Sequence, residues 1–295
     1  MEKRINKTMD RQDLDLASAR KIVSELDALI IQLKENNVKT SSWYGCFDLS
    51  GDKNSLEVIN RGIDYVPLPN AVDDTHFPWF LYWEIVWLVL HNDFKPGQTV
   101  LDMGGSSSLF SYYLASKGLR VTTIDLQESL VENANYTANR MNWNLQNTVM
   151  DMRDLSFSEQ FDFITSVCVF EHIPMYDRVE INKGIKNIIK PGGNFSITFD
   201  YRNPSRDAQI NSPQDVSSQF ITNSGLSPRG NALFFDNGKN YLLHPFYSDK
   251  VSKYRELAVE NGLFNVSDMD IVKTENDYTF GALFLINKED KQANI

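Results

Sequence analysis

The chain has few cysteines, no excess of positive charge and no apolar run of membrane-spanning length. Its 295 residues include only two cysteines, Cys46 and Cys168, which lie far apart and form no CxxC pair. Neither a disulfide framework nor a cysteine-based zinc site is expected, and a reducing compartment is favoured. We therefore predict a cytoplasmic protein.

Basic residues are also in short supply. Lys and Arg number 29 against 39 Asp and Glu, which gives a net charge of −10. Because phosphate backbones need a basic surface, this balance predicts no nucleic-acid partner. The most apolar stretch, residues 77–90, is too short for a bilayer and contains Glu84, so we expect a buried helix and no membrane partner. Residues 1–15 are charged throughout and lack the apolar core of a signal peptide.

What the sequence does contain is a succession of strands alternating with helices, which predicts an α/β fold. Short apolar runs indicate strands that are covered on both faces. The expected strands are 99–101, 121–124, 147–150, 161–169, 194–199, 266–272 and 280–286. The expected helices are 10–37, 78–92, 109–114, 128–141, 178–189, 213–222 and 247–261. Together they predict a doubly wound, mostly parallel seven-stranded sheet with an antiparallel last strand, the last two strands forming a hairpin at the sheet edge.

The regions outside this alternation suggest a domain division. We predict an N-terminal helical and irregular cap over residues 1–95 and a main domain over residues 96–295. An insertion at 201–246, after the fifth strand, is expected on the substrate side. The helix at 10–37 carries apolar residues on one face and is either a plain packing helix or a lid or dimer contact. A homodimer is therefore one expected assembly.

The most informative stretch is Val100–Asp125, which reads as a strand, a glycine turn, a helix and a second strand. Gly104 and Gly105 allow backbone angles that a side chain would oppose. The serines at 106–108 can cap the helix, whose N-terminal N–H groups face a ligand. Asp125 follows Gly104 by 21 residues, the position of an acid that accepts hydrogen bonds from ribose hydroxyls. The stretch predicts a nucleotide-binding site, although an ordinary α/β turn would share its glycines.

Four segments in series resemble the class I S-adenosylmethionine-dependent methyltransferases. They are VLDMGG, VTTIDL, MDMRDLSF, and FDFITSVCVFEHIP followed by KPGG. The resemblance covers residues 96–200, and the flanks match only in placement. It implies a Rossmann-like fold, S-adenosyl-L-methionine as cofactor, and transfer of a methyl group to oxygen or nitrogen of a small-molecule acceptor such as a sugar or secondary metabolite.

The resemblance also implies residue roles. The positions expected to bind the cofactor are Asp102, Gly104, Gly105, Ser106, Asp125, Leu126, Asp151, Met152, Val167 and Cys168. Asp125 would hold the ribose hydroxyls, and Asp151 would accept from the adenine amino group. Gly104 and Gly105 would pass beneath the methionine part, while Asp102 would orient this turn or reach the cofactor amine through water. The backbone after the fourth strand would meet the ammonium group.

Acceptor chemistry has four candidate residues. Since ligands of α/β sheets bind at the carboxyl ends of the strands, His172, Asp200 and Tyr201 are candidates there, and His244 could swing over the same site. A structural role stays open for both histidines. Some O-methyltransferases of this class, such as those of ubiquinone biosynthesis, place a metal on a Glu-x-x-Glu-His pattern. Cys168 takes the first of these positions here, and hard cations prefer oxygen ligands, so no metal is expected.

Three other interpretations stay open. A nicotinamide-dependent oxidoreductase could also use Asp125, although the chain lacks a GxGxxG pattern. A non-catalytic relative would bind the cofactor without turning it over. A methyltransferase could instead act on protein or RNA, and the net charge argues against RNA.

Overall fold

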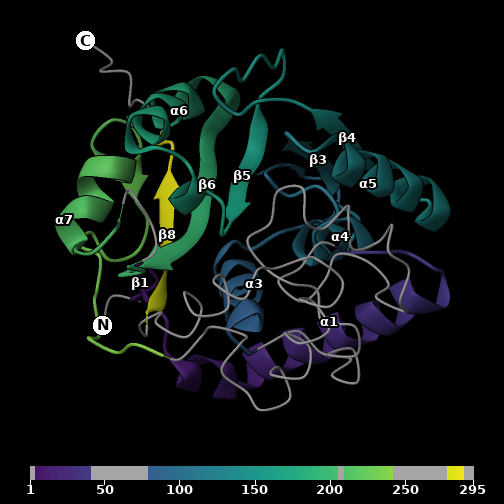
Figure 1. Cartoon of the computed structure of the whole chain (residues 1–295), viewed down its shortest axis with the longest axis horizontal. Helices are drawn as coiled ribbons and strands as arrows, with labels where there is room; N and C mark the ends of the chain where they lie inside the picture. Colours follow the sequence, from purple (N-terminus) through teal and green to yellow (C-terminus); the bar gives the residue numbers. More distant parts are fainter. Residues whose placement is uncertain (1–3, 41–78, 205–208, 242–277, 289–295) are drawn as a thin grey trace, which may run out of the picture.

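The computed structural model describes residues 4–40, 79–204, 209–241 and 278–288. One twisted sheet runs through the molecule, with helices on both of its faces (Figure 1). The strands are β1 (Lys7–Thr8), β2 (Thr99–Met103), β3 (Arg120–Asp125), β4 (Leu145–Val149), β5 (Phe161–Val167), β6 (Ile189–Tyr201), β7 (Ser227–Pro228) and β8 (Thr279–Ile286). The helices are η1 (Arg11–Asp15), α1 (Ala17–Glu35), α3 (Trp79–His91), α4 (Leu109–Ser116), α5 (Glu128–Met141), η3 (Phe170–His172), α6 (Met175–Ile188), α7 (Pro213–Val216) and η4 (Ser217–Ile221).

The sheet has the predicted class of topology. The strand order is β1-β8-β6-β5-β2-β3-β4, with β7 also paired to β8. Strands β2 to β6 pair in parallel and β8 runs antiparallel to β6, which confirms a mostly parallel sheet with an antiparallel last strand. The sequence did not predict β1 or β7. Both of these short strands pair with β8. Outside the described residues lie the predicted strand 266–272 and the predicted helix 247–261, and with them the predicted closing hairpin.

The core is divided by the sheet into two layers, because successive side chains of a strand point to opposite faces. Val100 belongs to the layer formed with α1, α3, α4 and α5, while Leu101 belongs to the layer formed with α6 and α7. Strand and helix boundaries differ from prediction by a few residues. Among the strands, the largest difference is at β6, which begins at Ile189 instead of Asn194 because Ile189 already pairs with Phe161 before a register shift.

Helix α3 is the buried helix predicted from the apolar run. Its residues from Phe80 to Leu88 are all buried, Glu84 included. Helix α1 packs beside it and buries the predicted apolar face. The predicted helix 10–37 is not continuous, because Leu16 separates the short helix η1 from α1. Within the described ranges, no helix combines the length and apolar character needed to cross a bilayer.

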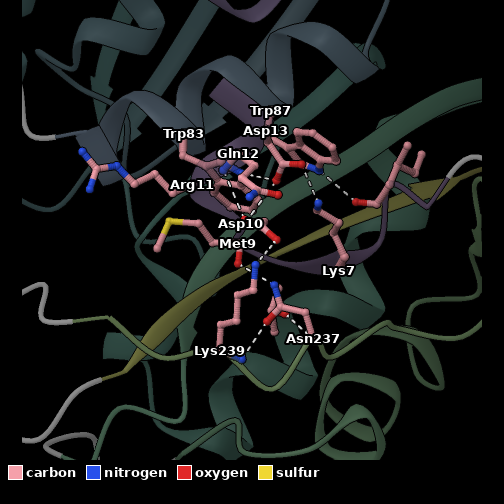
Figure 2. Close-up of polar contacts among 12 residues, drawn as sticks. Lys7, Met9, Asp10, Arg11, Gln12, Asp13, Trp83, Trp87, Asn237 and Lys239 are labelled. Carbon is pink, nitrogen blue, oxygen red and sulfur yellow. Dashed lines mark hydrogen bonds and ion pairs between the residues drawn. The ribbon is translucent and has the colours of Figure 1, made fainter. Parts of the chain in front are cut away.

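The N-terminal segment is fastened to α3 and to the loop after β7. In Figure 2, Asp13 accepts from Lys7 at 2.7 Å and from the Trp83 indole at 2.8 Å. On the other side, Lys239 donates to Asp10 at 2.6 Å. Because β1 joins the same sheet as β2 to β8, segments on both sides of residue 95 share one core. The division into a cap and a main domain remains a prediction.

Candidate functional site

The predicted cofactor-binding residues gather at one edge of the sheet. Strands β2, β3, β4 and β5 are parallel, so the loops after their carboxyl ends share that edge. The Gly104 amide donates to the Ile124 carbonyl at 2.8 Å, which holds the glycine turn beside Asp125. Asp151 and Cys168 follow the ends of the two flanking strands, β4 and β5. The sheet therefore brings together positions that are separated by as many as 66 residues in the chain.

The glycine turn is closed so tightly that side chains are excluded from it. Gly104 has a φ of +75°, and a Cβ there would lie 2.7 Å from the Val169 side chain. A Cβ on Gly105 would lie 1.9 Å from a carboxylate oxygen of Asp102. Both distances are far below ordinary carbon contacts, so packing as well as backbone angle requires glycine.

Asp102 lies underneath this turn and is fully buried. Its carboxylate accepts from the Ser111 hydroxyl at 2.6 Å and from the Thr165 hydroxyl at 2.9 Å. Burial raises the pKa of Asp102 to about 6, and the Ser111 and Thr165 hydroxyls oppose that shift. This arrangement fits the first of its two predicted roles, that of orienting the turn.

The three serines after the turn are used inside the protein. Ser108 caps α4 by accepting from the Ser111 amide at 3.0 Å, as predicted for this run. The Ser106 hydroxyl bonds the Thr123 hydroxyl at 2.8 Å, and Ser107 donates to the Leu130 carbonyl at 2.6 Å. The Ser106 hydroxyl is therefore occupied within the protein, and its backbone also bonds Asp125.

Asp125 and Asp151 stand in different surroundings. Burial raises the pKa of Asp125, while backbone N–H groups, that of Gln127 at 3.0 Å among them, stabilise its charge. Asp151 is paired with Arg153, whose guanidinium contacts it at 2.5 to 3.0 Å and lowers its pKa. Leu126 is 66% exposed beside Asp125, as a residue packing on a ligand would be. Met152 is half-buried after Asp151.

The segment after β5 and the end of β6 bring acidic side chains to the same edge. Val167 ends β5, and the next residue, Cys168, has a φ of +55° and points its thiol to within 3.7 Å of Asp200. The Cys168 sulfur and one carboxylate oxygen each of Glu171 and Asp200 all lie within 4.8 Å of one another. Asp200 also accepts from the Asn203 amide at 2.7 Å. The prediction placed Asp200 here but gave no role in the site to the buried Glu84, which faces Glu171 and Asp200 from α3.

The remaining catalytic candidates are dispersed. His172 is half-exposed, with Nε2 4.0 Å from a Glu171 oxygen. Tyr201 is fully buried and donates to Asp236 at 3.1 Å, and burial raises its pKa, so its hydroxyl stays protonated at neutral pH. His244 lies outside the described residues. The only feature of the sequence that pointed to a special role for Glu84 is its position as a single acid within the apolar stretch 77–90.

Comparisons with known proteins agree with the sequence motifs. A family model described as a methyltransferase domain matches residues 100–193. The ubiquinone biosynthesis O-methyltransferase of Coxiella burnetii is 35% identical over 108 residues, 36% of this chain and 45% of the relative. Its counterpart from Xanthomonas campestris is 31% identical over 143 residues, which cover 48% of this chain and 56% of that relative. The chain thus spans about half the length of the curated relatives it matches.

Among solved structures, the 4+2 cyclase SpnF superposes with a TM-score of 0.58 at 12% identity, covering 85% of this chain and 99% of SpnF. That likeness concerns the fold, and one fold hosts many reactions. The family match rests instead on the segment from the glycine turn to the start of β6. Residues 100–193 of this chain therefore match a methyltransferase-domain family, in agreement with the motifs that resemble the class I S-adenosylmethionine-dependent methyltransferases.

Proposed function

We propose that the protein is a methyltransferase that uses S-adenosyl-L-methionine to methylate a small molecule. The observation that carries this proposal is the convergence of four motif loops on one sheet edge around a turn that admits only glycine. The relatives named O-methyltransferases align with the same region. This region also contains the acids expected to bind a nucleoside.

The residues at the edge fit the cofactor. Gly104 and Gly105 hold the path of the turn, because a Cβ at either position would collide with Val169 or Asp102. The bare backbone of this turn would pass beneath the methionine part of the cofactor. Asp125 is placed to accept from the ribose hydroxyls, with Leu126 against the sugar or base. Asp151 can still accept from an adenine amino group, because a carboxylate has about four acceptor positions and Arg153 occupies only some of them.

Methyl transfer depends more on the alignment of the acceptor with the methyl group than on acid or base catalysis by the protein. The bound cofactor supplies a methyl group on a sulfonium, and the acceptor displaces it in line. The protein holds acceptor and methyl group in register and excludes water, which accounts for most of the acceleration in such transfers. His172 and Asp200 lie at the edge where an acceptor would enter, and their catalytic roles stay part of the proposal.

The wider context of the protein is also proposed. With a net charge of −10, a small acceptor fits better than a nucleic acid. The few cysteines favour the cytoplasm, and α1 offers a surface for a homodimer. An oxidoreductase is disfavoured, since the matched family is one of methyltransferases.

Calorimetry with S-adenosylhomocysteine and NADH tests the cofactor assignment. We expect the wild-type protein to bind S-adenosylhomocysteine, and Asp125→Ala to weaken binding by roughly 1–3 kcal/mol through loss of the ribose contacts. Asp154→Ala, an acid in the nearby loop after Asp151, is the matched control and should bind normally. Binding of NADH alone would reject the proposal. Cofactor binding without turnover over a broad acceptor panel would favour a non-catalytic relative.

A further inference from the structure

Three buried acids meet beside the glycine turn, and each comes from a different element. Glu84 comes from α3, Glu171 from η3 and Asp200 from the end of β6. Their exposed fractions are 0%, 3% and 2%, and the Cys168 thiol lies among them. We call these four residues the acidic cluster. Burying a charge is costly unless it is paired, so this arrangement calls for a positive group.

Glu84 is the member with the least compensation. Both of its carboxylate oxygens are buried, and within the described part of the chain neither has a hydrogen-bond partner. Burial is the main cause that raises the pKa of Glu84 well above its usual value, and repulsion from Glu171 and Asp200 adds to it. The Thr198 hydroxyl and Cys168 thiol offset only part of this shift. An unpaired buried carboxyl aimed at two others indicates a site for a cation.

Two basic side chains of the described residues, Arg178 and His172, lie beside Glu171. The Arg178 guanidinium is buried, interacts with Glu171 and donates to the Ile173 carbonyl at 2.8 Å. His172 lies 4.0 Å from the same Glu171, with a half-exposed ring.

The cluster borders the place expected for the reacting methyl group. Val169, next to Cys168, packs directly on Gly104 of the glycine turn. Val167, Cys168 and Val169 are all partly exposed, whereas the carboxylate oxygens of Glu84 and Glu171 beneath them are shielded from solvent. A group bound by the cluster would therefore lie close to the cofactor held on the turn.

The donor set favours an organic cation over a metal. Magnesium and calcium prefer shells of oxygen ligands, and a thiol stands in the middle of this one. Zinc is held in proteins mostly by sets of several Cys and His ligands, whereas this cluster combines one thiol with carboxylates. A phenolate or alkoxide acceptor would be repelled by the acids, whereas an ammonium group would pair with them.

We propose that Glu84, Glu171 and Asp200 bind the amino group of the acceptor, so that the enzyme is an N-methyltransferase of amines. This inference rests on the proposed function and names its substrate class. The amine enters as an ammonium ion and gives one proton to Glu84. The nitrogen lone pair then forms a bond to the methyl carbon as the carbon–sulfur bond breaks and its electron pair goes to sulfur. The products are S-adenosylhomocysteine and the N-methylated ammonium, and Glu84 returns its proton to water.

The test compares amines with alcohols of the same skeleton. Each compound is titrated at millimolar concentration into the full-length protein saturated with S-adenosylhomocysteine. The amines are butylamine, benzylamine and 2-phenylethylamine, and each is compared with the alcohol of the same skeleton. Release of S-adenosylhomocysteine is measured with the same compounds under turnover. We expect amines to bind and react in preference to alcohols. Glu84→Gln should reduce amine affinity roughly 10- to 100-fold, the scale of a lost charge-assisted contact.

Glu180→Gln, an exposed acid on α6 paired with Lys183, is the matched control and should leave amine binding unchanged. Retained affinity for S-adenosylhomocysteine shows that Glu84→Gln has folded. Three results would overturn the inference while leaving the proposed function intact. The first is that the wild-type protein binds none of the amines. The second is that it methylates the alcohols and needs added Mg²⁺ or Zn²⁺ to do so. The third is that Glu84→Gln weakens binding of S-adenosylmethionine alone, which would assign the cluster to the sulfonium. Failure to bind S-adenosylhomocysteine at all would instead reject the proposed function.

Discussion

At the scale of single residues, the glycine turn and the acid beneath it form one unit. Gly105 has no room for a Cβ because Asp102 fills the space, and Asp102 is itself fixed by Ser111 and Thr165. A change at either position must therefore disturb the other. The cofactor side of the site depends on packing as much as on hydrogen bonding.

Gly105→Ala tests this packing. A Cβ placed 1.9 Å from the Asp102 carboxylate must displace it, and such overpacking costs typically about 1–3 kcal/mol. We expect lower stability in urea and weaker binding of S-adenosylhomocysteine. Gly184→Ala, on α6 with open space around it, should instead stabilise by about 0.5–1 kcal/mol. Equal behaviour of the two variants would contradict the packing argument.

Asp102 also makes stability depend on pH. Its pKa is about 6 in the folded protein and 3.8 as the reference, so the folded state binds the proton more tightly. The free energy of unfolding should then fall as pH rises from about 4 to 6 and level off above, by up to about 3 kcal/mol. Asp102→Asn removes this contribution. Urea titrations across that range should show the variant gaining stability relative to wild type as pH rises, and parallel curves would reject the assignment.

At the scale of elements, α3 links the two halves of the chain. Its indoles bond the N-terminal segment, Trp83 to Asp13 at 2.8 Å and Trp87 to the Ile5 carbonyl at 2.9 Å. The same helix delivers Glu84 to the acidic cluster. Helix α3 therefore couples the placement of the N-terminus to the acceptor side of the site.

Asp13→Ala should weaken this link. The change removes the acceptor of Trp83, the ion pair with Lys7 and one half of the capping box with Asp10. We expect a loss of about 2–3 kcal/mol in urea denaturation. Asp15→Ala, an exposed acid of the same short helix, should stay within about 0.5 kcal/mol of wild type.

At the scale of the molecule, the sheet crosses the predicted domain boundary. β1 pairs with β8 at Lys7–Ala282 and Thr8–Gly281, and one core layer holds residues from α1, α3, α4 and α5. A molecule built in this way has no obvious plane along which the first 95 residues could unfold alone.

We therefore expect a single cooperative unfolding transition for the full chain. Four of the five tryptophans lie before residue 96, so their fluorescence reports mainly on the predicted cap. Far-UV circular dichroism reports on the sheet and helices together. Coincident melting curves from the two probes would support one folding unit, and an earlier fluorescence transition would support a separate cap.

The site could be predicted only in part from sequence, and the division follows the range of the interactions. The alternation of strands and helices, the glycine turn and the capping serine depend on neighbours in the chain, so apolar periodicity and residue type reveal them. The same is true of Asp125, which stands at the end of a recognisable strand. Boundaries such as the start of β6 depended on a partner strand and were misplaced.

The sequence by itself determined the α/β class, the glycine turn and the acids that follow the parallel strands. Only the tertiary structure decided that Glu84 meets Glu171 and Asp200, and that the N-terminus completes the sheet beside β8. Glu84 belongs to a helix that is apolar on every side, so no periodic pattern indicates which way it points. A contact between segments far apart in the chain leaves no local trace, and packing alone selects it.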